Sequence, residues 1–441
     1  MFRIKVYFFA FMISMLVGCG SGVDKRDNNT TKADNNKTEN EREEQETPVT
    51  RYYPQETTLK ARITDFNVSA PRIGHPITDL VFGTKIYKVE KEGSSFSPYP
   101  KVQAWNVDSS LLRIGNRLYH ADTLKETNRT KGQQESVAYA TLCSRNGDYF
   151  RWSHTRATTF YVLSSNNHFI QATIKDSSVD CSLTLDTFSE YEVVHIGPNE
   201  GSSDTQDRYI LFSAKKPNDI TMYAILFDMQ TGQRIWTKTI SEDFWVLTKG
   251  DWLPKNIDWI AISPSGKYIV LNNDNAGLNG MYRYDINLEN KTKLQYKWEG
   301  NGQLYSEGGH GDMGYDTDGN EVWVQFISGV GVYSFNLDAP NELGKKLLDS
   351  PYGGGHISCQ NTKRKGWCYV TTKGEKYQRV FALKLDGTSH ETVENFSQTY
   401  LPDDVYALGG VNPLGTQVIF NSYWSQTAAS FDTFIAEAIA P

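Results

Sequence analysis

The stretch Trp259-Ile-Ala-Ile-Ser-Pro-Ser-Gly266-Lys-Tyr-Ile-Val-Leu271 decides the fold class. An apolar run ends in the turn-forming residues 263–266, and a second apolar run follows directly. Pro and Gly between two short apolar runs favour a tight turn between paired strands. We therefore expect a hairpin of two antiparallel strands here.

The same unit recurs along the chain at a spacing of about fifty residues, which is the range of propeller blades. No window shows the 3.6-residue apolar period of a long helix. Seven such units predict an all-β fold, a seven-bladed β-propeller over residues 71–441, in which residues 80–87 complete the last blade and close the ring. Besides residues 259–271, the units begin at Gln103, Arg151, His195, His310, His356 and Val411.

Composition and net charge limit the classes of function that the protein can have. The 441 residues include 25 Tyr, 10 Trp and 35 Gly, which suits aromatic-rich strands and tight turns. The formal net charge is −7, whereas nucleic-acid binding requires a basic surface. We therefore expect no nucleic-acid partner, although a local cluster of Arg and His can still bind an anionic sugar.

The N-terminus reads as a targeting segment. The basic residues Arg3 and Lys5 precede an apolar run, residues 6–17. This run is too short to span a bilayer. The run ends in Leu16-Val-Gly-Cys19, which matches a lipobox. Residues 1–19 are thus predicted to be a lipoprotein signal peptide with Cys19 acylated after cleavage; an ordinary signal peptide with an incidental Cys is the alternative.

Residues 20–70 are predicted to be a disordered tether, because residues 20–50 contain almost no large apolar side chain. Gly20, directly after the Cys, does not resemble an inner-membrane retention signal of lipoproteins. We therefore expect a monomeric outer-membrane lipoprotein, held at the membrane by its lipid anchor and facing the periplasm or the cell surface.

Four cysteines remain, and an exported protein can oxidise them. Cys359 and Cys368 flank a predicted hairpin and can bridge its strands. Cys143 and Cys181 can form a second disulfide. For Cys359, a thiolate metal ligand is the alternative.

Polar residues at the same place in each repeat are expected to converge on one central channel. The predicted catalytic residues are His154 and His195, because imidazole titrates near neutral pH, and Arg151, because guanidinium pairs with carboxylate. Each also has a structural alternative. His154 can cap a turn, His195 can cap a strand, and Arg151 can pair with an acidic side chain of a neighbouring blade. The predicted substrate-binding residues are Gln103, Asn106 and Asn361.

A divalent metal (Zn, Mn or Ca) is the expected cofactor. Glycines beside His310 and His356 let the backbone approach an ion closely, and imidazole and carboxylate suit Zn or Mn. The predicted ligands are His310, Asp312 and His356; a hydrogen-bonded structural pair of histidines is the alternative. Residues 316–320 are similar to a Ca²⁺ loop, but turns at the same place in other repeats favour a hairpin turn.

Several of these motifs resemble β-propeller polysaccharide lyases, most closely the seven-bladed ulvan lyases and more distantly the oligogalacturonate lyases. The resemblance covers most of residues 75–441 and implies a His and a Tyr for proton transfer, with Arg or His to neutralise a uronate. It points to no particular Tyr among the 25. The motifs are residues 103–106, 151–154, 310–312 with the turn at 318–319, 355–358 and 412–415.

The activity that this resemblance implies is β-elimination on a uronic-acid-containing anionic polysaccharide, with ulvan as the foremost substrate. A base removes the C5 proton while a cation stabilises the charge that develops on the carboxylate. His154 is the expected base; Arg151 and His195, or a metal, are the expected neutralising groups. Two alternatives remain, a non-catalytic polysaccharide-binding surface lipoprotein and an envelope scaffold that binds other proteins.

Overall fold

The chain divides into two units, residues 1–47 and 48–441, and the computed structural model describes parts of the second. The predicted signal peptide, Cys19 and nearly all of the predicted tether therefore lie outside the described residues. Within the described part, no helix is long and apolar enough to cross a membrane. The described residues are 69–79, 82–89, 99–114, 117–122, 136–139, 143, 149–175, 178–197, 200–219, 221–240, 257–273, 280–327, 329–349, 355–372, 379–386, 393–398, 408–424 and 432–438.

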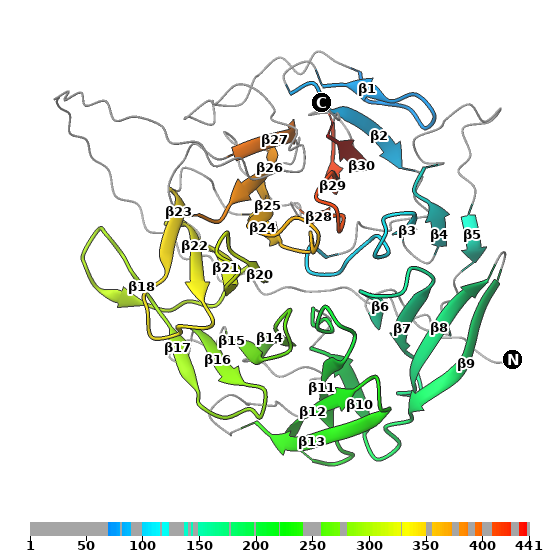
Figure 1. Ribbon diagram of the computed structural model, residues 1–441, viewed down its shortest axis with the longest axis vertical. Helices are drawn as coiled ribbons and strands as arrows, with labels where there is room; N and C mark the ends of the chain where they lie inside the picture. Colours follow the sequence, from blue (N-terminus) through cyan, green and yellow to red (C-terminus); the bar gives the residue numbers. More distant parts are fainter. Residues whose placement is uncertain are drawn as a thin grey trace, which may run out of the picture. The chain divides into compact units, whose positions relative to one another are not determined.

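Five four-stranded antiparallel sheets follow one another around a ring, each with its first strand innermost (Figure 1). The first two are β6 (Phe150–Trp152), β7 (Thr159–Leu163), β8 (Phe169–Lys175) and β9 (Ser178–Asp186), then β10 (Val193–Ile196), β11 (Tyr209–Lys215), β12 (Met222–Asp228) and β13 (Gln233–Thr239). The third is β14 (Ile257–Ile262), β15 (Tyr268–Asn273), β16 (Gly280–Asp285) and β17 (Thr292–Leu294), followed by a two-stranded ribbon of β18 (Tyr296–Lys297) and β19 (Leu304–Tyr305). The last two are β20 (Gly311–Tyr315), β21 (Glu321–Ile327), β22 (Gly331–Asn336) and β23 (Lys345–Asp349), then β24 (Gly355–Ser358), β25 (Trp367–Thr372), β26 (Arg379–Lys384) and β27 (Val393–Gln398).

Both ends of the chain build the closing blade. This five-stranded sheet contains β28 (Gly409–Val411), β29 (Gln417–Ser422) and β30 (Asp432–Glu437) from the C-terminal side. It also contains β2 (Lys85–Val89) and β1 (Ile77–Thr78) from the N-terminal side, and Lys85 of β2 pairs with Glu437 of β30. The prediction that an early strand closes the ring is therefore confirmed.

The prediction of seven complete blades is wrong. Among the described residues, six sheets have four or five strands, whereas β3 (Leu111–Ile114), β4 (Arg117–His120) and β5 (Ser136–Tyr139) form only a three-stranded sheet. The segment ahead of β3 was expected to supply the innermost strand of this unit. It keeps one bridge, Trp105 to Leu112, because the residues before Trp105 turn into the central channel instead.

Residues 99–103, which we call the plug, fill part of that channel. They contact other blades of the ring rather than their own sheet. Tyr99 bonds to His310, Lys101 lies 3.9 Å from the ring centre of Trp259, Ser358 donates a hydrogen bond to the carbonyl of Pro100, and Gln103 donates one to the carbonyl of Gln360.

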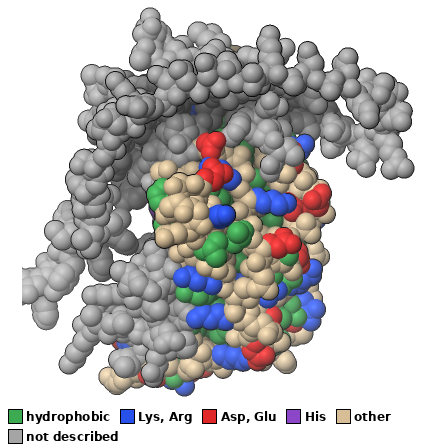
Figure 2. All heavy atoms as spheres, turned by 90° about the vertical axis from the view of Figure 1, so that its left-hand side faces the viewer, with side chains coloured by type: hydrophobic (Ala, Val, Ile, Leu, Met, Phe, Trp, Pro, Cys, Tyr) green, Lys and Arg blue, Asp and Glu red, His purple; other side chains and the backbone are tan. Residues whose placement is uncertain are grey.

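Apolar side chains fill the spaces between neighbouring sheets. Trp259 and Trp323, from β14 and β21, are both fully buried and lie 4.7 Å apart at their ring centres. Such aromatic contacts between sheets supply much of the buried area that holds a ring together. At the surface, the face in Figure 2 shows described Lys and Arg side chains interspersed with Asp and Glu.

Two disulfides cross-link segments of the chain. Cys359 pairs with Cys368, and Cys143 pairs with Cys181. Both predicted pairings are therefore confirmed, and Cys359 is not a free thiolate available to a metal.

Candidate functional site

The innermost strands of the five consecutive four-stranded blades are the first strands of their sheets and run in the same direction along the channel. Residues just before these strands lie at one end of the channel, which we call the entry mouth. Residues just after them lie at the other end, the exit mouth. The predicted site residues therefore separate into two groups according to their place relative to these strands.

A hydrogen-bonded phenol and imidazole lie at the entry side. Tyr149, directly before β6, shares a 2.6 Å hydrogen bond between its Oη and Nδ1 of His195 on β10. The two rings also stack, with centres 5.6 Å apart. His195 is buried, with 8% of its surface exposed, while Tyr149 is only partly buried. The phenol is thus the more accessible member of the pair.

A second group at the entry side joins the plug to two blades. The Oη of Tyr99 lies 3.0 Å from Nδ1 of His310, and the rings of His310 and His356 are 4.2 Å apart. His310 precedes β20 and is exposed, whereas His356 is the second residue of β24 and is buried. The structure thus brings together the two histidines that the sequence pairs.

The predicted metal site does not form as a set of three ligands. Among the described residues, no three His, Cys, Asp or Glu side chains are grouped closely enough to hold an ion. Asp312 lies two residues beyond His310, which is about 7 Å further along a strand, and its carboxylate binds the chain at Cys359 instead. The described residues therefore do not fit the predicted metal, and no chemical step is assigned to one here.

The residues that are similar to a Ca²⁺ loop form a turn. Asp316 accepts a hydrogen bond from Gly319, and its carboxylate accepts from the amide of Asp318. This turn joins β20 to β21, as the hairpin interpretation predicts.

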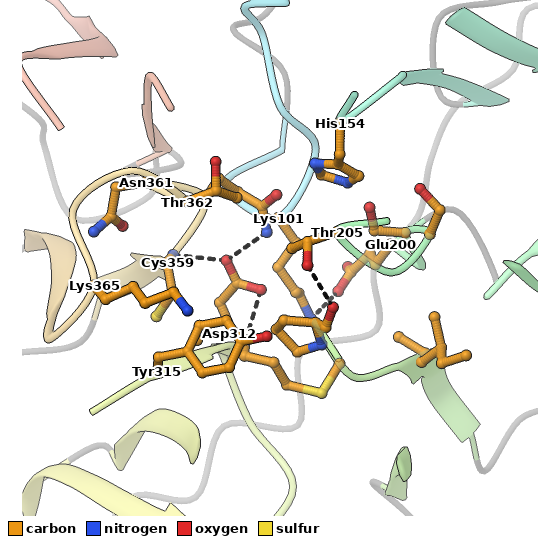
Figure 3. Close-up of a pocket in the computed structure, with 18 of the residues that line it drawn as sticks. Lys101, His154, Glu200, Thr205, Asp312, Tyr315, Cys359, Asn361, Thr362 and Lys365 are labelled. Carbon is orange, nitrogen blue, oxygen red and sulfur yellow. Dashed lines mark hydrogen bonds and ion pairs between the residues drawn. The ribbon is translucent and has the colours of Figure 1, made fainter. Parts of the chain in front are cut away.

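A pocket opens at the exit mouth, and we call it the exit pocket (Figure 3). Its volume is about 650 Å³ with the space open to solvent included. Turns that follow five innermost strands supply its walls, and Lys101 and Asp312 lie side by side in its floor. The walls include His154 after β6, Thr205 after β10, Pro264 after β14, Tyr315 at the end of β20 and residues 359–362, 364 and 365 after β24.

A buried ion pair lies in the floor of the exit pocket. Nζ of Lys101 lies 2.5 Å from Oε2 of Glu200, and the two side chains are 5% and 17% exposed. The same ammonium lies over the ring of Trp259, an arrangement that stabilises a cation most when water is excluded. The plug is thereby bound to two blades across the channel.

Burial controls the acidity of Asp312. Its carboxylate accepts hydrogen bonds from the amides of Cys359 and Met313 and from Nε2 of Gln360. Burial raises the pKa of Asp312 to about 6, while these donors and the nearby Lys101 act in the opposite direction. The carboxyl therefore titrates within the range in which a functional acid or base operates.

His154 is held at the rim of the exit pocket by its own loop. Its backbone amide donates to Oδ1 of Asp207, and the hydroxyls of Ser153 and Thr155 donate to the other carboxylate oxygen. Burial lowers the pKa of the His154 imidazole, although Asp207 and Asp204 oppose the shift. At neutral pH the imidazole is therefore uncharged. Its predicted role as a base remains a prediction.

The other predicted residues lie mostly inside the fold. The Arg151 guanidinium is 2% exposed and donates to the carbonyls of Gly201 and Phe150, so it does not line the exit pocket. Asn106 is fully buried and caps the start of β3 through Leu111. Gln103 belongs to the plug, and Asn361 lines the exit pocket while donating to two backbone carbonyls of its own loop.

Sequence reasoning missed Tyr149, Tyr99 and Lys101. Tyr149 stands two residues before Arg151, and Tyr99 and Lys101 stand just before Gln103, so all three lie next to recognised motifs. A search for Tyr immediately ahead of an innermost strand would have selected Tyr149. No local signal marks the contacts that Lys101 makes across the channel.

No family model matches the chain, and no curated protein matches it by sequence. Two solved oligogalacturonate lyases share its fold. One, from Vibrio parahaemolyticus, is 12% identical with a TM-score of 0.54, and the match covers 82% of this chain and 96% of that one. The other, solved in complex with manganese, is 10% identical with a TM-score of 0.53 over the same shares of the two chains.

The comparison supports the β-propeller fold at these low identities. No ulvan lyase is among the structures compared above, so the closer resemblance to ulvan lyases remains a prediction.

Proposed function

We propose that this chain is a polysaccharide lyase that cleaves a uronic-acid-containing anionic polysaccharide by β-elimination, with ulvan as the first substrate to test. The observation that carries the proposal is the 2.6 Å hydrogen bond between Tyr149 and His195. β-Elimination needs one group that takes the C5 proton and one that returns a proton to the C4 oxygen. A Tyr bonded to an imidazole can do both in turn.

The burial of the pair assigns the roles. His195 is buried and accepts the phenol proton, so Tyr149, which is more accessible, acts as the base on C5. The C5–H electron pair forms the C4–C5 double bond, the C4–O bond breaks, and the departing oxygen takes a proton from the Tyr149 phenol. The proton on His195 then restores the starting state. This scheme transfers the role of base from His154 to Tyr149.

A cation must also face the uronate carboxylate. His310 at the same mouth is exposed and bonded to Tyr99, and as an imidazolium it can donate to a carboxylate. Arg151 is less suited to this role because its guanidinium binds backbone carbonyls inside the fold. The fold shared with two oligogalacturonate lyases is consistent with the proposal.

The test is the ultraviolet absorbance of unsaturated uronate released from ulvan, pectin, alginate and glycosaminoglycans. Tyr149→Phe keeps the ring but removes the hydroxyl, and we expect kcat to fall by about 10²- to 10⁴-fold, the usual range for a lost acid–base group. Tyr223→Phe is the control, because Tyr223 lies on β12, the third strand of its blade, and its hydroxyl donates to the nearby Asp219, away from the innermost strand. Full activity of Tyr149→Phe would refute the assignment. Binding of ulvan without any chain shortening would favour the non-catalytic alternative.

We also propose that the protein is a monomeric outer-membrane lipoprotein acylated at Cys19. The support is the lipobox at residues 16–19. Labelling cells with a palmitate analogue should mark the wild-type protein and leave Cys19→Ser unmarked. Equal labelling of both would contradict the anchor.

A further inference from the structure

The exit pocket is separate from the proposed catalytic pair. Tyr149 stands before β6 and His154 stands after it, so the two lie at opposite ends of the same strand. The plug lies between the two mouths, with Tyr99 at the entry group and Lys101 in the floor of the exit pocket. A ligand in the exit pocket is therefore not bound in the proposed catalytic site.

The charges at the exit pocket favour an anion. Its one partly accessible carboxylate, Glu200, is neutralised by Lys101, and His154 is uncharged at neutral pH because burial lowers its pKa. Arg364 and the exposed Lys365 contribute two cations to the lining. The accessible groups that carry charge at neutral pH are thus mainly positive.

The remaining lining suits a sugar ring. Hydroxyl and amide side chains at Thr205, Gln360 and Thr362 share the lining with the partly buried Trp367. The ring of Trp259 is fully buried beneath Lys101 and is not offered to a ligand. Ligand sites commonly combine apolar and aromatic walls with a few polar groups that fix the orientation of the ligand. Hydrogen-bonding groups for hydroxyls, a partly buried aromatic wall and cations for one carboxylate together match a single sugar acid.

We propose that the exit pocket is a second carbohydrate site, which binds one hexuronate unit of an acidic saccharide. The choice of a uronate rests on the proposed function, but the pocket does not need the Tyr149–His195 chemistry in order to bind. Lys365 is the residue that pairs with the carboxylate. In the free protein its ammonium lies 4.1 Å from the ring centre of Tyr315.

The experiment titrates D-glucuronate, a monosaccharide with no glycosidic bond to cleave, into the full chain carrying Tyr149→Phe. Binding is followed by saturation-transfer NMR, with glucose and inorganic phosphate as comparison ligands. We expect glucuronate to bind, glucose to bind at least tenfold more weakly, and Lys365→Ala to weaken glucuronate binding about tenfold, the effect of losing one charge-assisted contact. Lys363→Ala is the matched control, because Lys363 is exposed on the same loop but does not line the pocket.

Three results would overturn the proposal: no binding of glucuronate, equal binding by the two lysine variants, or phosphate binding as tightly as glucuronate, which would indicate a general anion site. The test also separates this proposal from the lyase assignment. Lyase activity without binding at the exit pocket refutes only the second site. Binding at the exit pocket without any lyase activity refutes only the catalytic proposal.

Discussion

Replacing Lys101 by Met tests whether the plug is held by its buried ion pair. Met keeps much of the length of the side chain and its contact with Trp259 but removes the charge that lies 2.5 Å from Glu200. The Glu200 carboxylate is then buried without its cation, and removal of one partner from a buried pair costs about 3–5 kcal/mol. We expect that loss in the free energy of unfolding, measured by urea titration with tryptophan fluorescence as the signal.

The double variant Lys101→Met/Glu200→Gln separates the charge from the packing. It removes the charge of Glu200 together with that of Lys101, so most of the lost stability should return. The single Lys101→Met change should also raise the pKa of Asp312 further, because the nearby ammonium lowers it in the wild type. A loss below about 1 kcal/mol in Lys101→Met, or no recovery in the double variant, would refute the reasoning.

Two further changes test the floor of the pocket and a turn beside it. Burial raises the pKa of Asp312 from 3.8 to about 6, so this group makes the folded state less stable as pH rises through that interval. Between pH 4 and pH 7, the free energy of unfolding of Asp312→Asn should rise by about 2 kcal/mol relative to that of the wild type in urea titrations; a difference that does not vary with pH contradicts this. Gly197 has φ +55°, and a Cβ there would lie 2.1 Å from the carbonyl oxygen of Ile260. Gly197→Ala should therefore lower the melting temperature far more than Gly232→Ala, whose Cβ meets nothing within 4 Å, and equal effects would show that this crowding is relieved.

The repeat pattern predicts the blades because it is local. Residues 259–271 form the expected hairpin of β14 and β15, and the closing strand β2 pairs as expected with the C-terminal β30. Both disulfides are also confirmed, because Cys359 and Cys368 flank a hairpin and leave only one other pair. These features depend on turns, on strand periodicity and on a small number of cysteines.

The missing innermost strand ahead of β3 could not be predicted in this way. Apart from the bridge at Trp105, the segment leaves its own sheet, and Lys101 contacts Glu200 and Trp259 on other blades. Such contacts depend on the closed ring and leave no periodic signal in the sequence. The three predicted metal ligands do not form one group among the described residues for a related reason. Nearness of His310 and Asp312 in sequence was taken as nearness in space, whereas the two are about 7 Å apart along a strand.

The pairing of β2 with β30 has a consequence for how the protein is made. The early strand β2 cannot pair with β30 until the ribosome has produced β30, long after β2 itself. During that interval β2 has an open edge, and open edges can pair with other chains and aggregate. Removal of residues 432–437 would leave this edge of β2 open permanently, so the presence of β30 protects the molecule against aggregation.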